Sequence, residues 1–203
     1  MDKNTGFTSP TELYTLIKTR LENRQQQTYQ HASVVHREAA VLIPLFYKDH
    51  DPYLLFTRRT ETVEHHKGQI SFPGGVRDEN DHDLQTTALR ETREEVGIQD
   101  SDVTILGCTD RFLTNTHFMV TPYVGYFSFP YKFLINPAEI SQLIEVPLKH
   151  LLQPEIFEQK KWERDGVLWD VHFYYYNQET IWGVTGFLLS NFLSIVFGLK
   201  RMP

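Results

Sequence analysis

Residues 74–98 of this chain read GGVRDENDHDLQTTALRETREEVGI, and their second half has the pattern of a helix. Asp81 and Asp83 are candidate N-caps, because short acidic side chains can accept hydrogen bonds from the first free backbone amides. Gly97 is suited to the left-handed conformation that ends many helices. We therefore predict a helix that begins after one of these aspartates and ends before Gly97.

The predicted helix carries carboxylates at its C-terminal end. At about 100° per residue, its apolar stripe continues into Glu91 and Glu95, with Glu94 beside them. This placement costs energy, because like charges one turn apart repel and the macrodipole favours cations there. Arg90 and Arg93 could neutralise the charge in an ordinary solvated helix end. Because the carboxylates extend a buried stripe after a glycine pair, a hard divalent cation is the better interpretation.

These residues also carry a family resemblance. Residues 90–98, RETREEVGI, together with Gly75, resemble the signature of the Nudix hydrolases, which cleave a nucleoside diphosphate linked to another moiety. The usual pattern has glutamate where this chain has Asp81, and this chain has one more residue before Arg90. Both differences resemble the coenzyme A pyrophosphatase branch of that family.

The resemblance extends well beyond one motif, over roughly residues 38–197. It includes residues 55–59 (LFTRR), 68–75 (GQISFPGG), 136–139 (NPAE), 145–148 (EVPL) and 181–185 (IWGVT). One position departs from the branch, because Glu64 stands where an arginine usually lies.

The resemblance implies a metal site. Glu91, Glu94, Glu95 and the carbonyl of Gly75 would bind Mg²⁺ or Mn²⁺, which prefer oxygen ligands. Arg90 would orient a carboxylate through a bidentate pair and would not bind the ion directly.

The general base is less determined. Glu91 is one candidate, although metal binding is the role that we favour for it. Glu139, at the turn made by residues 136–139, is a candidate base or a ligand to a second ion. For Asp81 we prefer an N-cap role over direct metal binding.

Cations upstream of the glycine pair are candidates for binding substrate phosphates. Arg58 and Arg59 follow a predicted strand, so their side chains should point to opposite faces and one could reach the site. Lys67 could bind an additional phosphate, and His66 is either phosphate-facing or solvated. Gly74 would allow close backbone approach.

Composition limits the class of protein. The chain has 203 residues, enough for one domain with a substantial core. Its net charge of −6 argues against non-specific binding to nucleic acid. A single cysteine, Cys108, excludes an intramolecular disulfide and a cysteine-based zinc site. Without a recognisable leader, the cytoplasm is the expected location.

We expect residues 1–30 to form a helical extension that packs on a single Nudix hydrolase domain at residues 31–203. The expected fold is α/β, an α/β/α sandwich on a mixed sheet. Residues 48–52 should form a turn between two strands, and residues 164–166 a hairpin turn. Residues 180–199 carry no charge, and a buried helix is preferred over a homodimer interface and, last, a membrane span.

The expected activity is metal-dependent hydrolysis of coenzyme A or its thioesters to 3′,5′-ADP and 4′-phosphopantetheine or its acyl form. The alternatives are a diphosphatase acting on ADP-ribose or a dinucleotide, and a catalytically silent nucleotide-binding module. In each case the expected partner is a small nucleotide, with neither nucleic acid nor membrane involved.

Overall fold

A computed structural model describes residues 9–29, 36–61, 68–164 and 166–202. The helices and strands are, in chain order, α1 (Pro10–Glu22), β1 (Thr28–Tyr29), β2 (Arg37–Lys48), β3 (Asp51–Arg59), β4 (Ile70–Ser71), β5 (Gly74–Val76), α2 (Leu84–Val96), η1 (Asp100–Asp102), β6 (Thr104–Cys108), β7 (Arg111–Leu113), β8 (Phe118–Tyr126), β9 (Ile140–Pro147), α3 (Leu148–Leu151), η2 (Pro154–Ile156), β10 (Phe157–Arg164), β11 (Val167–Tyr176), β12 (Glu179–Trp182) and α4 (Gly183–Phe197).

The strands form two sheets. Within the described ranges, nine strands make one sheet with the order β1-β7-β8-β2-β3-β4, to which β5, β6 and β9 add at β2, β8 and β3. The pairs β2–β8 and β1–β7 are parallel, and β2 pairs antiparallel with β3 and β5. A second described sheet contains β10, β11 and β12. The expected mixed α/β architecture is confirmed.

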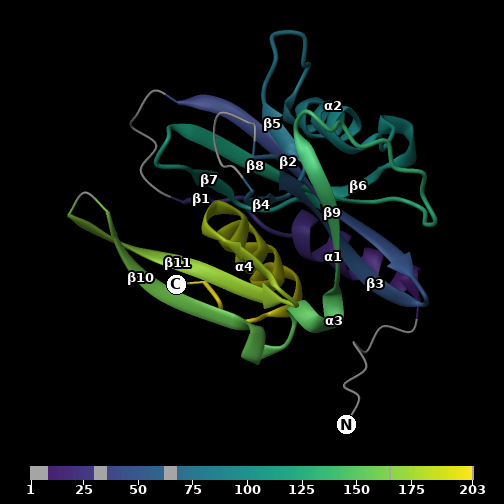
Figure 1. Cartoon of the computed structure of the whole chain (residues 1–203). Helices are drawn as coiled ribbons and strands as arrows, with labels where there is room; N and C mark the ends of the chain where they lie inside the picture. The colour runs from purple at the N-terminus through teal and green to yellow at the C-terminus, as the bar shows by residue number, and fades with distance from the viewer. Residues whose placement is uncertain (1–8, 30–35, 62–67, 165, 203) are drawn as a thin grey trace.

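Alternate residues of the central strands face two different cores. Ile43 and Leu45 of β2 belong to a large hydrophobic cluster that includes residues of α1, α3 and α4. The next residue, Phe46, belongs to a smaller cluster with Val96 of α2. Because strand side chains alternate, α2 covers one face of the sheet and α1 and α4 cover the other. Figure 1 shows α2 and α4 on opposite sides, with β10 and β11 beyond α4.

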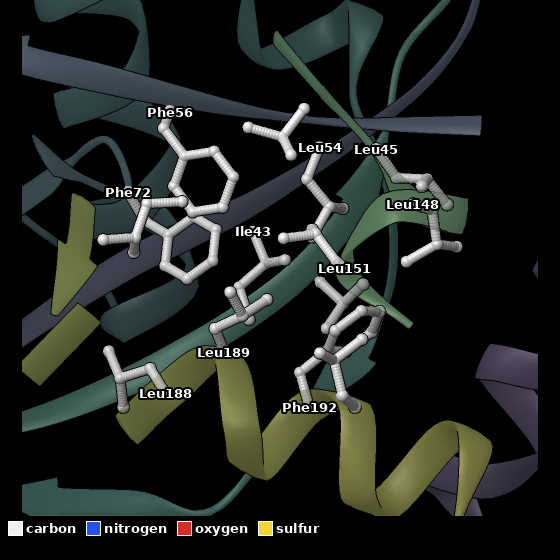
Figure 2. Close-up of a cluster of buried hydrophobic side chains, with 14 of the residues drawn as sticks. Ile43, Leu45, Leu54, Phe56, Phe72, Leu148, Leu151, Leu188, Leu189 and Phe192 are labelled. Carbon is white, nitrogen blue, oxygen red and sulfur yellow. The ribbon is translucent and has the colours of Figure 1, made fainter. Parts of the chain in front are cut away.

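The larger core joins α4 to the sheet. In Figure 2, Leu188, Leu189 and Phe192 of α4 point toward Ile43 and the neighbouring strand residues. All four of these side chains are at most 2% exposed. Burial on this scale explains why the uncharged segment 180–199 folds into the protein.

The C-terminal segment begins as a strand, which corrects part of the sequence prediction. Residues 179–182 form β12 against β11, and α4 starts only at Gly183. Thr180, Ile181 and Trp182 suit a strand, and pairing with β11 overrides a helical assignment. No described helix is long and apolar enough to cross a membrane.

Two local predictions can be compared with the structure. The N-terminal helix α1 is capped by Ser9, whose Oγ accepts from the amide of Glu12 at 3.3 Å, and Leu13 and Ile17 reach the large core. The turn expected at residues 48–52 is shorter, because β2 and β3 extend to Lys48 and Asp51. Asp49 and His50 both have positive φ angles, 52° and 67°, as a two-residue hairpin turn requires.

Candidate active site at the C-terminal end of α2

The acidic residues of α2 lie in different environments. Asp83 caps the helix by accepting from the amide of Thr86 at 2.7 Å, and Gly97 ends it with φ of 80°. At the C-terminal end, the side chains of Glu95, Glu91 and Glu94 are 2%, 17% and 50% exposed. The helix therefore directs one carboxylate into the protein, one to the border of the core and one toward solvent.

Arg90 connects the acidic groups around the helix. Its Nε and Nη2 donate to the two carboxylate oxygens of Asp81 at 3.0 and 2.9 Å. Its Nη1 donates to Glu91 at 2.9 Å and to Glu94 at 3.1 Å, and Nη2 also donates to the carbonyl of Val76 at 3.1 Å. One guanidinium thus fixes the positions of three carboxylates, two of them on its own helix.

Asp81 has a different role from the N-cap that we predicted. It is 4% exposed, and besides Arg90 it accepts from the hydroxyl of Thr87 at 2.9 Å. The backbone amide of Asp78 also donates to Oδ2 of Asp81 at 2.9 Å. The Arg90 hydrogen bonds hold the pKa of this carboxyl well below its usual range. Sequence reasoning missed this anchor, although an acidic residue at the family's glutamate position was the available signal.

Glu95 is a buried carboxylate whose negative charge is only partly offset by its neighbours. Burial raises its pKa to about 8; the charge of Arg59 opposes this rise, and the charges of Glu91 and Glu139 add to it. Its Oε2 is buried and has no hydrogen-bond partner among the described residues. Burial also raises the pKa of Glu91, with Arg90 opposing. Two neighbouring carboxylates are therefore destabilised as anions unless another cation is present.

The glycine pair packs against these carboxylates. A Cβ on Gly75 would lie 2.4 Å from the carboxyl carbon of Glu91. Gly74 has φ of 154°, and a Cβ there would lie 2.4 Å from the carbonyl oxygen of Ala40. Gly74 pairs with Val41 in the sheet, so its close approach is to the protein's own backbone.

We expect Gly75→Ala and Gly74→Ala to have different effects. At Gly75 the new methyl group meets the end of a flexible side chain, so the protein should fold while Glu91 moves and activity falls at least about tenfold. At Gly74 it meets backbone, and the melting temperature should drop. Thermal melts and kcat/KM for both variants test this. Equal melting temperatures for the two variants would contradict it.

The two adjacent arginines point to opposite faces. Arg59 lies over Glu95, with Nη1 3.7 Å from Oε1. Arg58 instead pairs with Glu179 of β12 and donates to the carbonyl of Gly68 at 3.3 Å. The structure thus places Arg59, and not Arg58, beside the carboxylates. His66 and Lys67, like Glu64, lie outside the described residues.

Glu139 is held near the end of α2 by its loop. The amide of Asn136 donates to the carbonyl of Glu95 at 2.9 Å, and Asn136 Nδ2 donates to Glu139 Oε1 at 3.1 Å. The influence of Glu139 on the pKa of both Glu91 and Glu95 also reflects its nearness. Asn136, which the sequence indicated only as a turn residue, positions this carboxylate.

The oxygen atoms of these glutamates fit a divalent cation, although arginines pair with the glutamates in this structure. Within the described ranges, no three His, Cys, Asp or Glu side chains stand together as a ready metal site. The unpartnered Oε2 of Glu95 and the Glu91 carboxylate against Gly75 are nevertheless the oxygen donors that such an ion requires.

Comparisons with known proteins identify the family of this chain. Residues 36–166 match the family described as NUDIX domain. A Photorhabdus laumondii protein named "Uncharacterized Nudix hydrolase NudL" is 40% identical over 154 residues, covering 76% of this chain and 82% of the relative. A Yersinia pestis protein of the same name is 37% identical over 157 residues, covering 77% and 78%. A solved C. elegans Ap4A hydrolase in a binary complex is 20% identical, with a TM-score of 0.48, and covers 55% of this chain and 80% of that one.

The family match and the two relatives define an enzyme class, the diphosphatases that hydrolyse phosphorus anhydrides. The chain belongs to the Nudix hydrolase family. It is therefore a hydrolase of pyrophosphate bonds in nucleotide derivatives, and enzymes of this family generally use divalent metal ions.

Proposed function

We propose that this enzyme hydrolyses the diphosphate bond of coenzyme A or its thioesters with Mg²⁺ or Mn²⁺. One observation carries the substrate assignment. The segments 55–59 and 68–75, which resemble the coenzyme A branch, meet beside the acidic end of α2. The amide of Arg59 donates to the carbonyl of Gln69 at 3.0 Å, and the Arg59 side chain reaches Glu95.

In this proposal Glu91, Glu94, Glu95 and the Gly75 carbonyl hold the ion. A bound divalent ion screens the charge of the diphosphate and acidifies water. Arg90 keeps Glu91 oriented through its Nη1 hydrogen bond of 2.9 Å. Glu95, buried and short of partners, is the ligand that gains most from a cation.

We assign proton abstraction to Glu139, with Glu91 as the alternative base. Glu139 is partly exposed, and Asn136 holds one of its oxygens while the other can face a water molecule. Water attacks one phosphorus of the 5′-diphosphate, its proton passes to the carboxylate, and the anhydride P–O bond breaks. The products are 3′,5′-ADP and 4′-phosphopantetheine, or the acyl form of the latter.

Arg59 is the described cation best placed to bind a substrate phosphate. Its guanidinium can form two parallel hydrogen bonds to phosphate oxygens. His66 and Lys67 remain candidates from the sequence for the additional 3′-phosphate.

A substrate screen tests the proposal. Coenzyme A, acetyl coenzyme A, ADP-ribose and diadenosine polyphosphates are incubated with enzyme and Mg²⁺ or Mn²⁺, and both products are identified by mass spectrometry. We expect kcat/KM to be highest for a coenzyme A compound, by about tenfold or more, because remote contacts contribute to transition-state binding. A coenzyme A value well below that for ADP-ribose or a dinucleotide would contradict the assignment.

We further propose that residues 1–30 are an extension of one domain at residues 31–203, and that the protein works in the cytoplasm. The packing of Leu13 and Ile17 in the large core supports the first point. Homodimer formation stays a prediction.

A further inference from the structure

The buried carboxylate of Glu95 lies beside an arginine from a different secondary-structure element. Arg59 of β3 lies above it, with Nη1 3.7 Å from Oε1. Arg90, although nearer along the chain, is committed to Asp81, Glu91 and Glu94. The charge of Glu95 is therefore opposed mainly by a residue from another element.

The Arg59–Glu95 contact is held by charge and not by hydrogen bonds. A distance of 3.7 Å between the charged atoms is too long for a hydrogen bond. Both Arg59 Nε and Glu95 Oε2 are buried without a partner among the described residues. The neighbouring Arg58, by contrast, is hydrogen-bonded to Glu179 and to Gly68. Of these two arginines, Arg59 is thus the one that is held to its carboxylate by charge and not by a hydrogen bond.

The backbone of Arg59 is anchored, and its side chain is partly exposed. Its amide donates to the carbonyl of Gln69, which anchors the backbone at the end of β3. Its side chain is 27% exposed, so the guanidinium lies at the boundary between the carboxylates and solvent. A long flexible stem from a fixed strand end allows the charge to move by several ångströms.

We propose that Arg59 is a placeholder cation for the metal ion. It neutralises Glu95 while the metal is absent, gives up this carboxylate when a divalent ion binds, and then turns its guanidinium to the substrate diphosphate. The inference rests on the proposed function. Two cations at one buried carboxylate repel each other, so Arg59 and the metal should compete when nucleotide is absent. When nucleotide is present, its phosphates receive Arg59, and the competition should end.

The test is direct measurement of metal binding. Mn²⁺ binding to the full chain is measured by isothermal titration calorimetry and by the electron paramagnetic resonance of free Mn²⁺, without nucleotide. Arg59→Gln is expected to bind Mn²⁺ about threefold or more tightly than wild type, because the competing ion pair is lost. An unchanged or weaker Mn²⁺ affinity would overturn the proposal.

A matched control separates this contact from a general change in net charge. Arg93→Gln removes the same charge from α2, but Arg93 pairs with Asp100 and its side chain is 41% exposed. We expect its Mn²⁺ affinity to equal that of wild type. A gain as large as that of Arg59→Gln would show only a long-range charge effect and would overturn the proposal. Circular dichroism melts confirm folding, and Arg59→Met replaces Arg59→Gln if the latter unfolds.

A second measurement follows Arg59 to the substrate. With saturating Mn²⁺, binding of adenosine 5′-(α,β-methylene)diphosphate should weaken about tenfold in Arg59→Gln. If nucleotide binding weakens while Mn²⁺ affinity stays at the wild-type value, Arg59 binds phosphate without being a placeholder, and the proposal fails. If wild type itself binds no Mn²⁺, the proposed function fails, and this inference fails with it.

Discussion

Replacing Glu95 with glutamine is expected to lower kcat/KM about a thousandfold while leaving the protein folded. The ionised form of this carboxylate is the donor that a metal ion needs, and loss of metal-assisted charge stabilisation removes several kcal/mol from catalysis. The metal-free variant should be at least as stable as wild type. The reason is that burial raises the pKa of Glu95 to about 8, so its charge costs energy in the folded state.

The measurement combines kinetics with melts in chelator and in Mn²⁺. Wild type should melt at a higher temperature with Mn²⁺, and Glu95→Gln should show no such increase. Glu94→Gln, whose side chain is 50% exposed, serves as the graded comparison and should lose less activity. If the glutamine at position 95 keeps the Mn²⁺-induced increase in melting temperature, Glu95 does not bind the metal.

Replacing Arg90 with glutamine should have the largest effect on stability. Asp81 is 4% exposed and holds two hydrogen bonds from Arg90, so removing the arginine leaves a buried carboxylate without its cation. Breaking such a pair costs about 3–5 kcal/mol. Urea unfolding at neutral pH measures this loss, and activity should fall as well because Glu91 loses its orienting donor.

A double-mutant cycle is the control for the Arg90 prediction. Asp81→Asn removes the buried charge, so combining it with Arg90→Gln should recover part of the lost stability.

The pH dependence of the stability that Asp81 contributes has a definite sign. Because the folded-state pKa of Asp81 is below its unfolded value, its stabilisation is present above about pH 4 and is lost as the pH falls further. Wild type and Arg90→Gln should therefore converge in acid. A stability difference that does not shrink as the pH falls below about 4 would show that the Asp81 charge is not responsible.

Sequence patterns predicted the helix α2 well because its signals are local. Asp83 and Gly97 stand at its two ends as capping chemistry requires, and both act within a few residues of the chain. The same local reasoning could not separate Asp81 from Asp83, since both are acidic and both precede the helix. Only the contact between Asp81 and Arg90, across the start of the helix, distinguishes an anchor from a cap.

Predictions were less complete for a segment whose structure depends on pairing with another strand. Residues 180–182, which with Glu179 make up β12, were assigned to the C-terminal helix because they are uncharged and continuous with it. They form β12 instead because β11 offers a partner edge, and Trp182 pairs with Phe173 there. The β-forming residues of this segment allow a strand, but the partner edge that decides it is a property of the folded neighbour.

By itself, the sequence determined the family resemblance, the mixed α/β architecture and the end of α2 at which the acidic residues gather. These follow from periodicity, capping and motif spacing, which act along the chain. Only the tertiary structure decided that Arg59 faces Glu95 while Arg58 turns to Glu179. It also decided that Glu95 has a buried oxygen without a hydrogen-bond partner in the part of the chain that the structure describes. Alternation along a strand says that neighbours point apart, but the packing of other elements on each face decides which of them meets the carboxylate.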